Sequence, residues 1–220
     1  MAGDLEAIED LVAIELSDSA HDVWSTAELD QHIRHALQMY SVANPVVASV
    51  VLDTEADVYE YPLLVAEAEG PVYQLPPYYY GVVDVWYPWD EELPVYPPPR
   101  PDGWALISTD NLLIRSACRP TGEDNCKLRV FYTTGYTIQD LDEAEDSTLP
   151  ADGETLVVYG ASAYAALQRA QDAVARVYPN ADTPAALRSW GEMRLKQFVA
   201  QLASLRQSRN IAGDARVKLG

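Results

Sequence analysis

The change from helix to strand falls within residues 24–52, which read WSTAELDQHIRHALQMYSVANPVVASVVL. Ser25 and Glu28 have the spacing of a capping box, in which the two side chains bond free backbone N–H groups at the start of a helix. The apolar side chains that follow share one helical face, at Leu29, Ile33, Ala36, Leu37 and Tyr40. Pro45 ends this helix because a proline disfavours helical backbone at the preceding residue. The valine-rich residues 46–52 then predict a strand.

Three further helices are predicted, one before this segment and two near the C-terminus. Residues 4–16 carry apolar side chains three and four apart, as one buried face requires. The third helix begins near residue 152, and its middle, 160–166, reads GASAYAA, so a neighbouring helix can approach closely. The fourth begins at Thr183-Pro184, where threonine caps the helix and proline fits its first turn. Its apolar spacing fades after Arg209.

The middle of the chain has the pattern of a small antiparallel β region. Strands are expected where β-branched and aromatic residues gather, over residues 46–52, 58–64, 81–87, 104–108, 111–117 and 127–134. The loops at 73–81 and 87–103 read YQLPPYYYG and YPWDEELPVYPPPRPDG. Long irregular loops of this kind are usually functional or packed against a partner.

The predicted fold class is therefore α+β, a helical bundle with a β insertion. The bundle consists of two N-terminal and two C-terminal helices, within residues 1–44 and 150–208. Residues 45–149 form the inserted small antiparallel β domain with its Pro/Tyr-rich loops. Residues 209–220 are expected to be a flexible basic tail.

The charge of the chain is strongly negative and uneven. The net charge of −19 over 220 residues argues against a nucleic-acid-binding surface over most of the body. Residues 188–220 hold seven basic and two acidic side chains, so this end carries +5 and the rest of the chain −24. The asymmetry indicates either a basic end that meets an acidic partner or a solvated helix with a basic tail.

No membrane contact is expected. No apolar run reaches about 18 residues. The N-terminus, MAGDLEAIEDLVAIEL, is acidic and lacks the basic start and cleavage site of a secretory signal. The protein is therefore expected to stay in the cytoplasm in which it is made, unless something carries it out.

The sequence offers no convincing catalytic constellation, so no catalytic residue, metal ligand or cofactor is predicted. It contains no GxSxG, phosphate-binding glycine loop, HExxH or CxxC motif. His32 and His35 lie three apart on the second helix with His21 nearby, but a metal would need further donors that the sequence does not place. Exposed or interfacial histidines are the favoured interpretation.

A cluster of acidic and aromatic residues at 84–96 supports an enzymatic alternative. It places four carboxylates among three large rings: Asp84, Asp90, Glu91 and Glu92 beside Trp86, Tyr87 and Trp89. A sugar-cleaving enzyme uses two carboxylates among aromatic platforms. However, a 220-residue chain divided between helices and a small β region leaves little room for a substrate cleft. The favoured interpretation is that these rings fill the β domain or contact a neighbouring subunit, where Tyr and Trp are enriched.

Cys118 and Cys126 flank a polar segment, RPTGEDN. If this segment closes a hairpin, the two residues could face each other and form a disulfide. A cytoplasmic protein keeps its thiols reduced, whereas a component later carried to an oxidising exterior need not. Two unpaired structural thiols and a disulfide therefore both stay open.

Three groups of residues follow one another along most of the chain. The first group is the acidic first helix followed by Trp24-Ser25-Thr26-Ala27-Glu28-Leu29-Asp30, His35-Ala36-Leu37 and Tyr40-Ser41. The second group is Val130-Phe131-Tyr132-Thr133-Thr134, followed by an acidic loop and Ser147-Thr148-Leu149-Pro150. The third group is residues 157–166, VVYGASAYAA, followed by Thr183-Pro184 and a last amphipathic helix. This order resembles the head-tail adaptor (connector or neck) proteins of tailed bacteriophages. The family's motifs are structural rather than chemical, and the proline-rich loops at 71–101 depart from them.

The resemblance implies a non-enzymatic structural protein of the virion neck that is made in the host cytoplasm. Such adaptors look like helical bundles, some with a β insertion, and form rings, typically dodecamers, beneath the portal protein. Their C-terminal helix and tail dock on the portal, and the other face receives the tail or a stopper protein. Genomic DNA passes through the channel without specific binding. Neighbouring copies in such a ring meet through two different surfaces.

Two sets of site residues follow as hypotheses. The basic end is expected to dock on the portal through Arg206, Arg209, Arg216 and Lys218. Aromatic residues are expected to contact an adjacent subunit or a neck partner, through Tyr78, Tyr79, Tyr80, Trp86, Trp89 and Tyr96. The alternatives are a carbohydrate-binding or glycan-cleaving protein that uses the cluster at 84–96, and another phage joining protein such as a stopper or tail-completion protein.

Overall fold

The computed structural model divides the chain into two compact units, which we call the helical unit and the β unit. The helical unit comprises Met1–Pro45 and Gly135–Gly220, and the β unit comprises Val46–Thr134. The residues that the structure describes are 3–67, 70–73, 75, 79–90, 92, 95–108, 111–116, 118–123, 126–175 and 182–217. The α+β class and the insertion of a small antiparallel β region between the second and third helices are confirmed.

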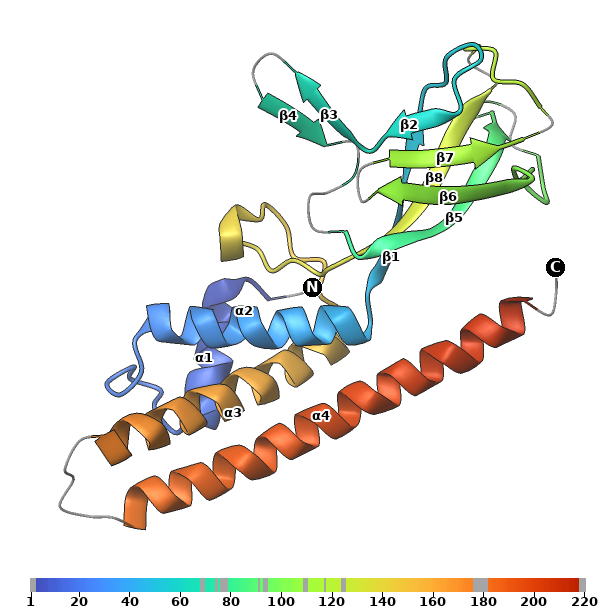
Figure 1. Cartoon of the computed structure of the whole chain (residues 1–220). Coiled ribbons are helices and arrows are strands. Elements are labelled where there is room, and N and C mark those ends of the chain that lie inside the picture. The colour runs from blue at the N-terminus through green and yellow to red at the C-terminus, as the bar shows by residue number, and fades with distance from the viewer. Residues whose placement is uncertain are drawn as a thin grey trace. The chain divides into compact units, whose positions relative to one another are not determined.

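Within its described residues, the helical unit contains four α-helices (Figure 1). They are α1 (Leu5–Glu15), α2 (Thr26–Ala43), α3 (Ala151–Ala175) and α4 (Asp182–Val217), with a short 3-10 helix, η1, at Leu141–Glu143. The predicted capping box is present, since the Ser25 hydroxyl accepts from the Glu28 N–H and the Glu28 carboxylate accepts from the Ser25 N–H. Asp4 caps α1 in the same way by accepting from the N–H of Ala7.

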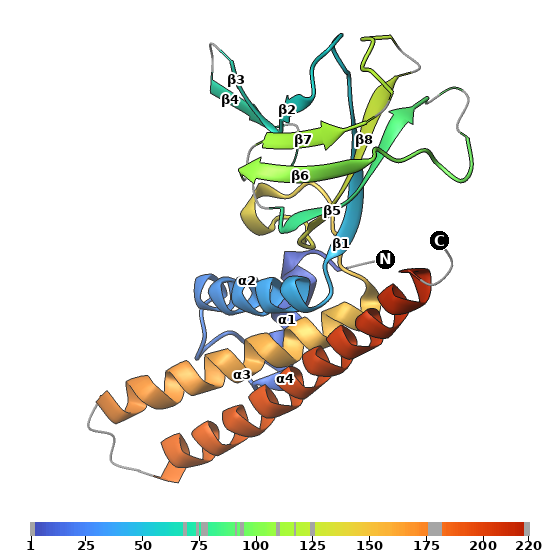
Figure 2. The same ribbon diagram turned by 45° about the vertical axis from the view of Figure 1, so that its right-hand side comes forward.

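The core of the helical unit lies where α1 and α2 pack on α3 and α4 runs antiparallel beside α3 (Figures 1 and 2). The small residues of α3 let the helices approach closely. A Cβ built on Gly160 would lie 2.9 Å from the Cβ of Ala36 and 2.9 Å from the ring of Phe198. On α4, a Cβ on Gly191 would lie 3.0 Å from the Cγ of Leu167. Burying these apolar faces against one another is the main stabilising contribution in the unit.

Residues 135–149 belong with the helices, which corrects the boundary expected at residue 149. The backbone N–H of Tyr136 donates to the hydroxyl of Ser41, and the N–H of Leu5 donates to the carbonyl of Gln139. Three apolar side chains of the segment are buried in the helical core, at Ile138, Leu141 and Leu149. The sequence does not predict this packing, because the segment is acidic and its apolar residues are too few and too irregularly spaced to indicate a packed segment.

The fourth helix is longer than the sequence predicts. It continues to Val217 and spans 36 residues, whereas residues 209–220 are expected to be a flexible tail. Residues 209–217 contain no proline that would end a helix, and most of them are ordinary helix formers. The described part of the supposed tail is therefore helical.

The β unit contains two three-stranded antiparallel sheets and a small two-stranded sheet. The first has the order β1-β8-β5, with β1 Val46–Leu52, β8 Lys127–Thr134 and β5 Gly81–Trp89. The second has the order β2-β7-β6, with β2 Glu60–Pro62, β7 Asn111–Arg115 and β6 Gly103–Ser108. The third pairs β3 (Leu64–Glu67) with β4 (Gly70–Tyr73).

The core of the β unit lies between the two three-stranded sheets. Leu128, Val130 and Val85 from the first sheet pack with Leu112 and Ile114 from the second. Strands that alternate buried and outward side chains are expected for sheets packed on one face. The single strand expected at 58–64 is in fact divided: β2 pairs with β7 and β3 pairs with β4, with buried Leu63 between them. Strand β4 is not among the predicted strands.

None of the helices in the described residues combines the length and the apolar character that crossing a membrane requires.

Candidate interaction surfaces

The C-terminal part of α4 extends beyond the helix on which the rest of α4 packs. Gly160 of α3 lies against Phe198 of α4, and Leu167 of α3 lies against Gly191 of α4. The two contacts are seven residues apart on each helix and run in opposite directions, so they define one antiparallel register of α3 and α4. This register places Ala151, the first residue of α3, opposite residue 207 of α4. Residues 208–217 therefore form an overhang of about 15 Å at 1.5 Å per residue. We call this segment the α4 overhang.

Three of the four residues expected to dock on the portal lie at or within the α4 overhang. Arg206 is exposed on the last turn before it, and the positions of Arg209 and Arg216 are helical. Lys218 lies outside the described residues. The backbone positions of Arg206, Arg209 and Arg216 therefore belong to one helix, with about two turns between Arg209 and Arg216.

The predicted aromatic contact residues are placed in different environments. Tyr80 and Tyr96 are exposed, at 46% and 70% of their surface. Trp89 is buried, Trp86 is half-buried, and Tyr79 is half-buried against the core with its ring 6.4 Å from that of Tyr132. Tyr78 lies outside the described residues. The set therefore does not form one exposed cluster among the described residues.

Arg129 is the centre of an aromatic cluster on the outer face of the β1-β8-β5 sheet. Its guanidinium carbon lies 5.5 Å from the Trp86 ring, 4.8 Å from the Trp89 ring and 5.1 Å from the Phe131 ring. Its Nε and Nη2 donate to the hydroxyl of Ser49 at 3.3 and 3.1 Å. The cation is thus held flat among π faces that attract it. This surface carries a fixed positive charge in a strongly acidic chain.

Both carboxylate oxygens of Asp84 accept hydrogen bonds within the same cluster. One carboxylate oxygen accepts from the Trp86 Nε1 at 3.0 Å and from Arg100 Nη2 at 2.9 Å. The other accepts from the backbone N–H of Val85. The first carboxylate of the proposed sugar site therefore fixes the tryptophan and the arginine around it.

Arg129 and Phe131 are the functional candidates that sequence reasoning missed. The signal was present in the strand predicted over residues 127–134, because side chains alternate between the two faces of a strand. Leu128 and Val130 point into the core, so Arg129 and Phe131 must point outward. The register places Arg129 opposite Trp86 on β5.

The two cysteines are free and lie beside each other. Cys126 is buried, and the Tyr87 hydroxyl lies 3.0 Å from its Sγ. Cys118 is exposed; desolvation of its thiol, and then the charge and hydrogen bonding of Cys126, raise the pKa of Cys118. The proximity needed for a disulfide is therefore present between two reduced thiols.

The histidines occupy separate places in the helical unit. His21 lies 3.4 Å from a carboxylate oxygen of Asp10. The ring of His35 packs edge-on against Tyr164, 4.4 Å between centroids, and burial lowers the pKa of His32. Across the part of the chain that the structure describes, no group of three or more His, Cys, Asp or Glu side chains is arranged to hold a metal ion.

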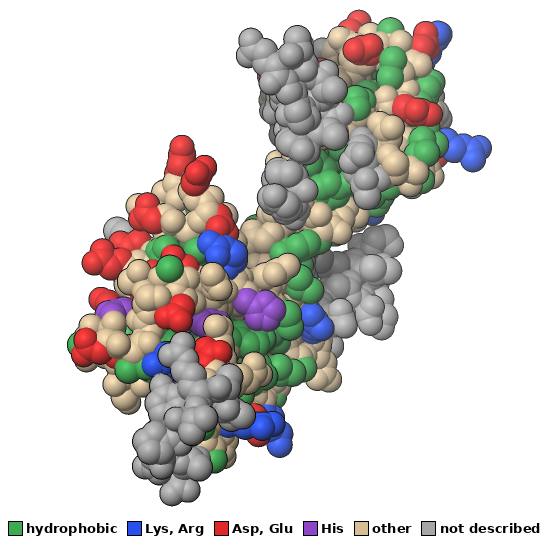
Figure 3. Space-filling view, turned by 60° about the vertical axis from the view of Figure 1, so that its left-hand side comes forward, with side chains coloured by type: hydrophobic (Ala, Val, Ile, Leu, Met, Phe, Trp, Pro, Cys, Tyr) green, Lys and Arg blue, Asp and Glu red, His purple; other side chains and the backbone are tan. Residues whose placement is uncertain are grey.

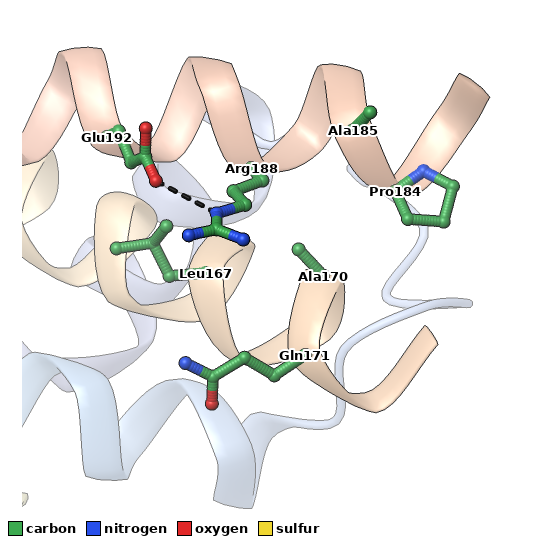
Figure 4. Close-up of a pocket in the computed structure, with 7 residues that line it drawn as sticks. All are labelled: Leu167, Ala170, Gln171, Pro184, Ala185, Arg188 and Glu192. Atoms are coloured by element: carbon green, nitrogen blue, oxygen red, sulfur yellow. Dashed lines mark hydrogen bonds and ion pairs between the residues drawn. The ribbon is translucent and has the colours of Figure 1, made fainter. Parts of the chain in front are cut away.

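A surface hollow of about 640 Å³ lies between α3 and α4 (Figure 4). Its walls are mostly aliphatic, with Leu167 and Ala170 from α3 facing Pro184 and Ala185 from α4. Arg188 and Glu192 on α4 bond each other at 2.9 Å, so their charges are already paired. The lining residues that the structure describes offer no unpaired charge to fix a polar ligand.

The helical unit has an acidic and a basic side. Residues 4–45 and 135–149 hold fourteen Asp or Glu residues and one basic residue, Arg34, which pairs with Asp142. Figure 3 shows many carboxylates gathered on one face of this unit. By contrast, α4 holds six Lys or Arg residues and three acidic ones. The charge asymmetry predicted from the sequence is therefore a feature of one folded unit.

No protein-family model matches the sequence, and no curated protein matches it significantly.

Proposed function

We propose that this protein is a structural component of a tailed-phage virion, a head-to-tail adaptor. In this role it forms a ring beneath the portal protein, joins the capsid vertex to the tail and continues the DNA channel. The portal, neighbouring copies of the chain and a tail or stopper protein are its partners.

The observation that carries the proposal is the α4 overhang. In the register of α3 and α4 the overhang lies beyond the first residue of α3, and most helical stability in proteins comes from packing against a partner. A helical extension with basic residues at its base and along its length is suited to docking in a groove of an acidic partner. The resemblance to adaptors implies the same end of the chain as the portal-docking element.

The acidity of the body suits a channel through which DNA must pass. Carboxylates repel the phosphate backbone, so a wall that carries them does not retain DNA during packaging or ejection. The acidic side of the helical unit, with fourteen carboxylates and one arginine in residues 4–45 and 135–149, supports this role.

The aromatic cluster favours a protein contact over a saccharide site. A saccharide needs accessible ring faces and free carboxylates. Here the Trp86 and Trp89 rings face Arg129, and Asp84 is bound by Arg100, Trp86 and Val85. The polar groups of Arg129 and Asp84 are therefore already bound within the cluster. Tryptophan and arginine are also enriched among the residues that dominate the binding energy of protein interfaces.

Capture of partners from infected cells tests the proposal. A tagged copy should recover the portal protein in near-equal copy number, measured by quantitative mass spectrometry. Deletion of residues 208–220 should abolish that recovery. Arg115→Glu, which reverses an exposed arginine of the β unit, is the matched control and should retain it. Recovery of no virion protein by the full chain would refute the adaptor role, and recovery that survives the deletion would refute the docking element alone.

A further inference from the structure

Two helices of the helical unit expose apolar side chains on faces turned away from its core. On α1, Ile8 and Val12 are buried, whereas Leu11 and Ile14 are 45% and 62% exposed. Leu11 and Ile14 lie three residues apart, so they share one face of the helix. We call this face, which also includes exposed Ala7 and Asp10, the α1 outer face.

The corresponding face of α4 lies opposite the buried residues Phe198 and Leu202. It exposes Met193 and Val199, at 51% and 49%, and Lys196 between them. Small exposed residues complete it, at Ala186, Ala200 and Ala203. We call it the α4 outer face. Small side chains bring the axis of a packed helix close to the surface, so this face is shaped to receive another helix.

The two faces have opposite charge. All four ionisable residues of α1 are acidic; Glu9 is buried and Glu15 bonds Arg194 of the same chain, so Glu6 and Asp10 carry the charge of the outer face. Glu6 and Asp10 are exposed beside Leu11 and Ile14. On the α4 outer face the exposed charges are Lys196 and Glu192, with Arg188 and Arg206 at one edge. Glu192 is paired with Arg188 at 2.9 Å, so Lys196 and Arg206 leave the face positive. Opposite charges around apolar centres attract and fix the orientation of two surfaces.

We infer that the partner of the α1 outer face is the α4 outer face of a second copy of this chain. Because the two surfaces differ, the contact is heterologous, and each copy can bind one neighbour through α1 and another through α4. Repetition of this contact closes a ring when the rotation between copies allows it. The inference rests on the proposed ring and names the surfaces that build it.

Single-face variants test this arrangement on the purified full-length protein. Ile14→Asp blocks the α1 outer face, and Met193→Asp with Val199→Asp blocks the α4 outer face. Sedimentation should show wild-type oligomers that grow with concentration, and each variant should dimerise roughly 30-fold more weakly, the effect of losing about 2 kcal/mol at an interface centre. An equimolar mixture of the two variants should form a dimer and stop there, because each supplies the face that the other lacks.

The control is Ile107→Asp, the same substitution at a 56%-exposed isoleucine of β6. It should associate like the wild type, and circular dichroism should show that all variants unfold at the wild-type temperature.

Four results would overturn the inference: a wild-type protein that stays monomeric at its highest soluble concentration, self-association of either blocked variant at wild-type strength, a mixture that stays monomeric, or a control that fails to associate. Self-association of the wild-type protein together with a failure to capture the portal protein would support this interface and refute the adaptor role.

Discussion

Glu9 is a buried carboxyl that faces another carboxyl across the α1–α2 contact. Its desolvation, its hydrogen bond to Asp30 and the negative charges of Asp30, Asp10 and Glu6 raise the pKa of Glu9 to about 8. The protonated acid can donate to Asp30, whereas two ionised carboxylates would repel each other. At neutral pH Glu9 therefore keeps its proton, which lies between the two helices.

This pair predicts that stability declines as pH rises. Because the folded pKa lies above the unfolded value of 4.5, the contribution is fully present below pH 4.5 and is lost progressively as pH rises through about 8. Glu9→Gln, which keeps a donor and cannot ionise, should unfold at a higher temperature than the wild type at pH 9 and at a similar temperature at pH 4.5. Glu145→Gln, an exposed change in the helical unit at a carboxyl that does not act on Glu9, is the control. Equal pH profiles for wild type and Glu9→Gln would contradict this account.

The Cys118–Cys126 pair is a second prediction at the scale of single residues. Excess oxidised glutathione should form one S–S bond; the two thiols lose two protons and two electrons, and the glutathione disulfide is reduced to two thiols. Closing so short a loop should stabilise the β unit by about 2–3 kcal/mol. A mass loss of two hydrogens and a raised unfolding temperature are the expected readouts. The prediction fails if both thiols remain open to alkylation, and Cys118→Ser should show neither change.

At the scale of elements, the close packing of α3 depends on Gly160. A Cβ there would meet Ala36 and Phe198 at 2.9 Å, so Gly160→Ala must push α2 and α4 apart. Overpacking costs about 1–3 kcal/mol, which exceeds the roughly 1 kcal/mol that alanine gains over glycine in a helix. Chemical denaturation should therefore show net destabilisation. Gly81→Ala, where the added Cβ meets nothing within 4 Å, should show no such loss, and a Gly160→Ala protein more stable than the wild type would disprove the packing argument.

Local signals in the sequence predict most of the elements correctly. The capping box fixes the start of α2, and runs rich in β-branched and aromatic residues identify β1 and β8 with their observed bounds. The predictions fail for segments whose apolar residues have no regular spacing. Residues 135–149 are acidic, and their backbone bends through positive φ angles at Asp140 and Asp142. Only tertiary contacts show that they pack with the helices.

The interaction surfaces could be predicted only in part. Net charge along the sequence identifies the basic end, because charge counts need no structure. The Arg129 cluster combines residues from β5, β8 and β1, which only strand register brings together. Likewise, the outer faces of α1 and α4 become visible only when the core shows which side of each helix is already covered.

At the scale of the whole molecule, the acidic side of the helical unit predicts how the protein meets DNA. Glu145 and Asp146 are exposed in its acidic segment, so Glu145→Lys with Asp146→Lys changes the charge of that surface by +4. Each added lysine can neutralise a phosphate and release its counterion, so binding should appear at low salt and weaken steeply as salt is raised. Purified wild-type protein should not retard double-stranded DNA in a gel, whereas the variant should. If the protein has the proposed adaptor role, particles that carry the variant should also eject DNA more slowly. Asp53→Lys with Glu60→Lys, at two exposed positions of the β unit, is the control. It shows whether any charge reversal of this size affects DNA binding and ejection, or only one on the acidic side. Unchanged ejection by the first variant would place the acidic side away from the channel, and equal slowing by both would assign the effect to net charge alone.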